Sequence, residues 1–97
     1  MFDIEITEAY EKWFRKLKDK QAQDIINIRL RRIKEGNLGD HKSLGNGLFE
    51  IRIHYSGGYR LYFINKGSRW ILILCGGAKS TQSKDIKLAR KLAEEVK

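Results

Sequence analysis

The sequence predicts an α+β domain with elements in the order β-α-α-β-β-β-α, built as a small antiparallel sheet with helices packed on one face. Three patterns lead to this prediction. Apolar side chains recur at helical spacing over residues 8–35, alternate with polar ones over residues 48–65, and recur at helical spacing again over residues 83–96. A run of strands flanked by helices is typical of the α+β class.

The first strand and two helices are predicted in residues 2–35. Residues 2–7 (FDIEIT) alternate between apolar and polar side chains, which indicates a short strand. Thr7 is expected to cap a helix over residues 8–18, whose apolar stripe is Tyr10, Trp13, Phe14 and Leu17. A second helix is predicted over residues 20–35, with the stripe Ala22, Ile26, Leu30 and Ile33. Its other face is basic, and such a face is usually just solvated.

The second half of the chain predicts a sheet and a final helix. Residues 36–47 are rich in glycine and are expected to form a loop. The segments LFEIRIHY and YRLYFIN alternate on either side of SGG, which predicts a β-hairpin. A third strand, RWILILC, is apolar on both faces and is expected at the centre of the sheet. A helix follows over roughly residues 83–96, with Ser83 as its cap.

Length and composition limit the class of protein. The 97 residues suit one domain spanning 1–97, and the net charge of +8 indicates an anionic partner, although the excess charge also serves solubility. The longest apolar run is too short to cross a bilayer, and the acidic start does not resemble a secretory signal. The single cysteine, Cys75, is expected to be a buried, inert thiol, so a reducing, cytoplasmic location is expected.

The segment GGAKSTQSKDI (76–86) raises the question of a nucleotide site. A phosphate-binding P-loop requires G-x-x-x-x-G-K-[ST], but Ala78 precedes Lys79 here, and the leading glycine is replaced by Ile73. A nucleotide-hydrolysing site is therefore not predicted. Gly76 and Gly77 are expected to end the strand and turn the chain toward the last helix.

Charged side chains gather on the predicted sheet face that lies opposite the helices. The alternation places Glu50, Arg52, His54, Arg60 and Tyr62 there, with Lys79 at the end of the next strand and with His41 and Lys42 on the preceding loop. Arginine forks suit phosphate oxygens and aromatic rings suit unstacked bases, so this face is a candidate RNA site. Surface salt bridges are the alternative for each arginine, and simple solvent exposure is the alternative for His54.

Such a face has the groups that metal-free RNA cleavage requires. A 2′-hydroxyl attacks the adjacent phosphate when a base removes its proton, cations stabilise the charge that develops and an acid protonates the leaving 5′-oxygen. Arg52, Arg60 and Lys79 are candidates for stabilising charge, and Glu50 or His54 for moving protons. No spacing typical of metal ligands occurs, so neither a metal nor another cofactor is expected.

The segments LFEIRIHYSGGYRLYF and ILILCGGAKSTQSKDIKLA resemble the RelE/ParE superfamily of type II toxins, in particular the HigB-like addiction module killer proteins related to a phage host-killing branch. The resemblance covers most of the chain and implies the RelE-like fold. It also implies a cytoplasmic, ribosome-dependent mRNA endonuclease that cuts the codon in the ribosomal A site. The implied partners are the 70S ribosome, its mRNA and a HigA-like helix-turn-helix antitoxin.

The resemblance also assigns roles to residues. Arg60 matches the main phosphate-binding arginine, Arg52 the basic position on the preceding strand, and Lys79 the basic residue after the last strand. Glu50 matches a carboxylate base of some relatives less closely. The expected contacts to RNA or the ribosome are Lys42, Tyr62, Gln82, Arg29 and Arg32.

The sequence departs from the family pattern at two positions. Some relatives carry an arginine after the lysine and a tyrosine or histidine near the C-terminus, where this chain has Ser80 and Ile86. The general acid is thus open: Lys79 or a different residue does that work, or activity depends on the ribosome for geometry. Two other functions remain as alternatives, a ParE-like toxin that blocks a topoisomerase and an inactive module that only binds an antitoxin.

Overall fold

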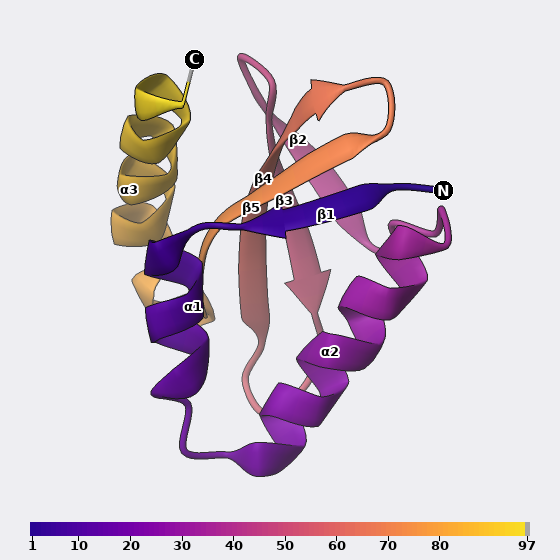
Figure 1. The fold of residues 1–97 in the computed structure, drawn as a ribbon. Helices are drawn as coiled ribbons and strands as arrows, with labels where there is room; N and C mark the ends of the chain where they lie inside the picture. The colour runs from indigo at the N-terminus through magenta and orange to yellow at the C-terminus, as the bar shows by residue number, and fades with distance from the viewer. Residues whose placement is uncertain (97) are drawn as a thin grey trace.

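The computed structural model describes residues 1–96 and contains a five-stranded sheet with three α-helices (Figure 1). The strand order is β1-β5-β4-β3-β2. In chain order the elements are β1 (Asp3–Ile6), α1 (Glu8–Arg15), α2 (Lys20–Lys34), β2 (His41–Gly45), β3 (Leu48–Ile53), β4 (Tyr59–Gly67), β5 (Trp70–Ala78), a short 3₁₀ turn (Lys79–Thr81) and α3 (Gln82–Glu95). The predicted α+β class and every predicted element are confirmed.

The sheet differs from the prediction in two ways. β1 runs parallel to β5, whereas the other neighbours are antiparallel, so the sheet is mixed. The predicted loop over residues 36–47 contains the additional strand β2, which pairs with β3 at the sheet edge. Its sequence, HKSLG, lacks apolar alternation because both faces of this edge strand are largely exposed. Its main chain, paired with β3, defines the strand.

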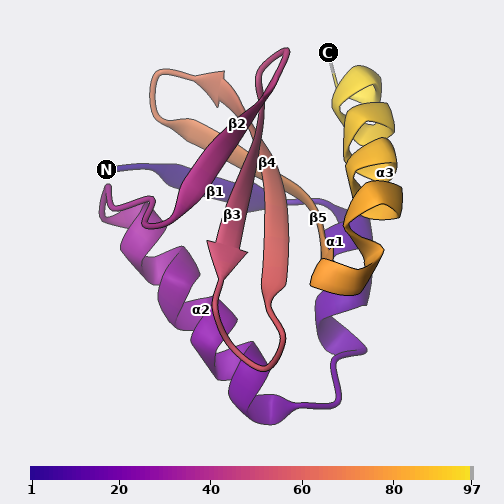
Figure 2. The same ribbon diagram turned by 180° about the vertical axis from the view of Figure 1, so that it is seen from behind.

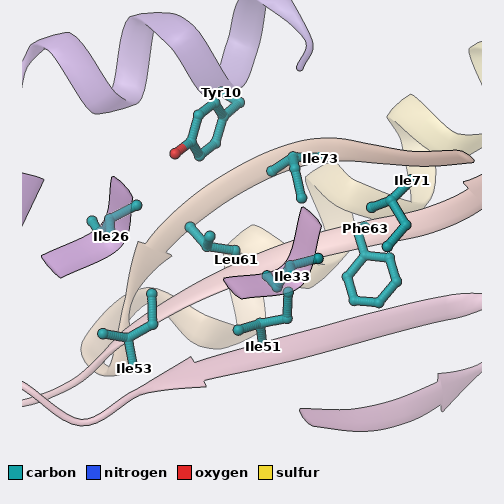
Figure 3. Packing of buried hydrophobic residues seen from close by; sticks show 9 residues of the cluster. All are labelled: Tyr10, Ile26, Ile33, Ile51, Ile53, Leu61, Phe63, Ile71 and Ile73. Carbon is teal, nitrogen blue, oxygen red and sulfur yellow. The ribbon is translucent and has the colours of Figure 1, made fainter. Parts of the chain in front are cut away.

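Helices α1 and α2 cover one face of the sheet, and the main core lies between them and the strands. Figure 3 shows Ile51, Ile53, Leu61 and Phe63 from the sheet together with Tyr10 of α1 and with Ile26 and Ile33 of α2. These side chains are almost completely buried. The alternation of the predicted hairpin is confirmed on this face. Thr7 caps α1 as predicted, since its hydroxyl accepts a hydrogen bond from the Tyr10 amide at 3.0 Å.

Helix α3 lies on the opposite face, so the prediction that all helices share one face is wrong (Figure 2). Ala89, at the centre of α3, packs in a second cluster of buried residues, Leu48, Tyr62, Leu72, Leu74 and Cys75. This cluster explains why β5 is apolar on both faces: each face has its own helical cover. Helix α3 begins at Gln82, so Ser83 lies inside the helix and is not its cap. None of the helices in residues 1–96 is long and apolar enough to cross a membrane.

Gly76 and Gly77 lie within β5 and do not form the turn that was predicted. Both are needed for close packing. A Cβ at Gly76 would lie 2.5 Å from the Trp13 ring, and a Cβ at Gly77 would overlap the Asp85 carboxylate. The two glycines therefore let α1 and α3 approach the same strand from its two faces.

We expect Gly76→Ala to lower the free energy of unfolding by about 1–3 kcal/mol, the usual cost of forcing extra volume into a packed core. The indole of Trp13 has little room to move, because it packs between Tyr10 and Tyr59. Gly67→Ala is the matched control, since a Cβ there meets nothing within 4 Å. Urea unfolding of both variants measures the difference, and equal stability of the two would contradict the packing argument.

Candidate functional site: a basic pocket at the β3–β4 hairpin

Two arginines lie side by side at the hairpin end of the sheet. Arg52 on β3 and Arg60 on β4 are direct partners in the antiparallel register. Their side chains share the face that carries α3, beside the 3₁₀ turn that begins this helix. Two like charges directly opposite each other repel, so this pair requires a compensating anion.

Glu50, two residues before Arg52 on β3, provides that anion. Its side chain is 0% exposed, with Oε2 at 3.0 Å from the Nε of Arg52 and Oε1 at 3.3 Å from the Nε of Arg60. The contact to Arg52 is a hydrogen bond, whereas the contact to Arg60 is an ion pair without hydrogen-bond geometry. Gln82 of α3 donates a third interaction to Oε1 at 2.6 Å. The buried carboxylate therefore joins β3, β4 and α3.

The hairpin loop brings Lys79 to the same place. Ser56, Gly57 and Gly58 all have positive φ angles, a conformation that glycine adopts without strain. The resulting tight loop lets the Gly58 carbonyl accept a hydrogen bond from the Lys79 amide at 3.2 Å. The start of the 3₁₀ turn is thereby attached to the tip of the hairpin.

An open pocket of about 320 Å³ lies between these elements. The cations Arg52, Arg60 and Lys79 line it together with His54, and the main chain of the hairpin loop contributes to its wall. The side chain of Arg60 is only 13% exposed and that of Arg52 is 34% exposed, so both are held in place by their surroundings. Cations held in place at an open pocket suit an anionic ligand such as a phosphodiester.

His54 reaches this pocket while paired to a carboxylate. Its Nε2 lies 2.6 Å from Oδ2 of Asp40, a residue just before β2. The hydrogen bond to His54 is the largest cause that lowers the pKa of Asp40 below its usual value, followed by the nearby positive charges. Sequence reasoning missed Asp40, because it lies in a glycine-rich segment with no pattern that relates it to His54.

Other predicted site residues lie outside the pocket. Tyr62 is completely buried beneath α3, so its ring has no free face for a base, and burial raises the pKa of its hydroxyl. The Arg29 guanidinium donates to the carbonyls of Leu38, Asp40 and Arg52, which gives it a structural role; burial lowers its pKa. Gly39 touches that guanidinium and has no space for a Cβ.

The remaining predicted contacts are placed around the pocket. Gln82 contacts the buried carboxylate of Glu50 from within the site. Lys42 is exposed on β2, opposite Glu50 in the register, and Arg32 is exposed on α2, where it lines a neighbouring hollow with His54. Glu50 itself, predicted on an open face, is enclosed, because Gln82 at the start of α3 and the two arginines cover its carboxylate.

Cys75 is buried, as predicted. Burial, with a smaller contribution from the charge of Asp85, raises the pKa of its thiol to about 12, so the thiol is protonated at neutral pH and is a poor nucleophile. Within residues 1–96, His, Cys, Asp and Glu side chains do not gather in groups of three that could hold a metal ion.

We expect Glu50→Gln to lower the free energy of unfolding by about 3–5 kcal/mol, because two arginines lose the buried charge that compensates them. Glu94→Gln is the matched control, since it removes the same charge from an exposed position on α3. Urea unfolding at neutral pH compares the two. Similar stability of both variants would mean that the carboxylate does not hold the strands and the helix together.

Comparison with solved structures identifies the fold. The isolated RelE toxin of Escherichia coli superposes with a TM-score of 0.67 at 19% identity, covering 90% of this chain and 97% of RelE. A chain of the intact E. coli RelBE toxin–antitoxin complex gives a TM-score of 0.67 at 20% identity, covering 80% of this chain and 96% of the other. At this level of identity the likeness establishes a RelE-like fold.

Comparison of sequences gives the family. An uncharacterised protein of Haemophilus influenzae is 46% identical over 93 residues, which are 96% of this chain and 94% of that protein. The profile of the phage-derived Gp49-like proteins (DUF891) matches residues 12–95. This match includes both arginines, Glu50, His54 and Lys79. The chain therefore belongs to the phage-derived Gp49-like (DUF891) family.

Proposed function

We propose that this protein is the toxin of a type II toxin–antitoxin system, and that it cuts mRNA on the ribosome. The observation that carries the proposal is the pocket in which Arg52, Arg60 and Lys79 come together over a buried carboxylate. The RelE-like fold supports it, because the solved relatives with this fold are described as a toxin and a toxin–antitoxin complex.

The proposed reaction is attack by an RNA 2′-hydroxyl on the adjacent phosphate. The O2′–P bond forms as the P–O5′ bond breaks, which leaves a 2′,3′-cyclic phosphate and a free 5′-hydroxyl. Negative charge accumulates on the non-bridging oxygens in the transition state, and Arg52 and Arg60 are suited to bind them. The ammonium group of Lys79 provides a third positive charge at the pocket wall. No metal is required for this step.

In this proposal Glu50 holds the two arginines in position and is not the general base. Another group removes the proton of the 2′-hydroxyl. A general base must come within hydrogen-bond reach of the substrate hydroxyl. The side chain of Glu50 is fully buried, and its two oxygens are occupied by hydrogen bonds from Arg52 and Gln82 and by the ion pair with Arg60. Holding the arginines in place before the substrate arrives reduces the reorganisation needed during reaction.

The proposed partners are the ribosome with its mRNA and a cognate antitoxin. The net charge of +8 favours binding to ribosomal RNA. Two exposed basic residues add to it: Lys42, opposite Glu50 in the strand register, and Arg32, which lines a neighbouring hollow with His54. A helix-turn-helix antitoxin is the partner that the family resemblance implies. The RelBE complex, in which a protein of the same fold is bound to its antitoxin, supports this part of the proposal.

We expect the parent protein to cut a reporter mRNA at codon-phased positions in a bacterial translation extract, and Arg60→Ala to leave the mRNA intact. Primer extension with active and with inactivated ribosomes detects the cuts and their dependence on translation. A thermal melt must show that the variant is folded, since Arg60 faces the buried Glu50. If the mRNA stays intact although the parent protein is toxic, and gyrase is inhibited, the results would instead support a toxin that blocks a topoisomerase.

We expect Lys79→Met to reduce the cleavage rate at least about tenfold, because an electrostatic contact to the transition state is worth more than about 1.4 kcal/mol. The residue is exposed, so the fold should not change. Lys87→Met is the matched control, as it removes the same charge from an exposed position on α3. Equal rates for both variants would remove Lys79 from the site.

A further inference from the structure

The two arginines, Lys79 and the buried Glu50 do not supply a proton acceptor for the proposed reaction. The titratable side chains that line the pocket are Arg52, His54, Tyr55, Tyr59, Arg60 and Lys79. Arginine stays charged at neutral pH and lysine normally does, so neither has a free lone pair. The hydroxyl of Tyr55 is engaged with Asp19 at 2.9 Å, and this hydrogen bond raises its pKa. Histidine is the side chain whose ordinary titration range lies near neutral pH.

We propose that His54 is the general base of the cleavage reaction and that Asp40 is the positioning residue that orients its imidazole. The inference rests on the function proposed above. Its geometric basis is the 2.6 Å contact between Nε2 of His54 and Oδ2 of Asp40, at the rim of the pocket that also holds both arginines and Lys79. A carboxylate can only accept, so Nε2 carries the hydrogen and Nδ1 of the neutral ring keeps the lone pair.

Asp40 is well placed to orient His54, because two hydrogen bonds hold its main-chain carbonyl. Its carbonyl accepts the Arg52 amide at 2.9 Å, and the same carbonyl accepts a guanidinium N–H of Arg29 from α2, also at 2.9 Å. Arg29 further binds the Arg52 carbonyl at 2.8 Å. The main chain of Asp40 is thus tied to the strand that carries Arg52, one of the phosphate-binding candidates.

The proton balance of the step is simple. Nδ1 of His54 takes the proton of the 2′-hydroxyl as the O2′–P bond forms. The imidazolium that results is stabilised by the Asp40 carboxylate, the same logic by which an aspartate supports the histidine of a serine protease. The P–O5′ bond breaks, and the leaving 5′-oxygen takes a proton from water. Deprotonation of the imidazolium by solvent restores the enzyme.

The test measures single-turnover cleavage on mRNA-programmed ribosomes at saturating protein. We expect His54→Ala to slow the step about 100-fold, within the usual contribution of a general base, and Asp40→Ala to slow it about tenfold. His41→Ala is the matched control: His41 is the other histidine, exposed at the start of β2 and outside the pocket lining. The wild-type rate is expected for it.

Two further measurements separate proton transfer from a structural role. Imidazole added to the buffer should raise the cleavage rate of His54→Ala at least about tenfold. The His54 side chain is 76% exposed, so free imidazole can reach the position that it leaves. It should not accelerate Asp40→Ala, which retains its own imidazole. The double variant Asp40→Ala/His54→Ala should be as slow as His54→Ala alone, since Asp40 acts only through His54.

Each outcome decides the matter. A His54→Ala variant that cuts at the wild-type rate, or one that imidazole does not rescue, overturns the proposal. Additive losses in the double variant overturn the role of Asp40. If the parent protein does not cut mRNA at all, the function proposed above fails. If the parent cuts and Arg60→Ala does not, while His54→Ala is fully active, only the present inference fails.

Discussion

The carboxylate of Glu50 is the interaction on which the site depends. Arg52 and Arg60 face each other across two strands, and without a negative charge between them their repulsion would separate their guanidinium groups. Placing that charge in the interior is costly, and the cost is offset only when several donors surround it. Here Arg52 and Gln82 donate hydrogen bonds to it and Arg60 forms an ion pair with it. The polar cluster thus connects the sheet to α3, and at the same time it holds two cations at the rim of an open pocket.

The two-sided sheet explains why this cluster is buried. Helices α1 and α2 cover one face, and α3 covers part of the other, so β5 lies between two helical layers. Gly76 and Gly77 allow both layers to approach this strand closely. At the hairpin end α3 has only begun, and there the sheet becomes accessible. The boundary between covered and open sheet therefore lies between Glu50 and the guanidinium groups of the arginines.

Most of the fold was predictable, because strands and helices with one buried face show it in their apolar spacing. β2 was not, since its HKSLG sequence is polar and its main chain alone defines it. The position of α3 was missed although RWILILC, apolar on both faces, indicated two covered faces. Among the predicted site residues, Arg52, Arg60, Lys79 and His54 line one pocket, and their roles stay predictions. Tyr62 and Glu50 were misplaced, because alternation tells which face a side chain occupies and not whether a distant helix covers that face.

The contact between Glu50 and Gln82 spans 32 residues of sequence, and it has a consequence for the order in which the protein is made. During synthesis the two strands with their arginines emerge first, and the carboxylate between them has no complete set of donors. Lys79 and α3 follow only near the end of the described sequence. The pocket is therefore completed only after Lys79 and the start of α3 have followed the two strands. For a protein proposed to act on ribosomes, this order delays activity until α3, as well as the two strands, has emerged from the ribosome that makes the chain.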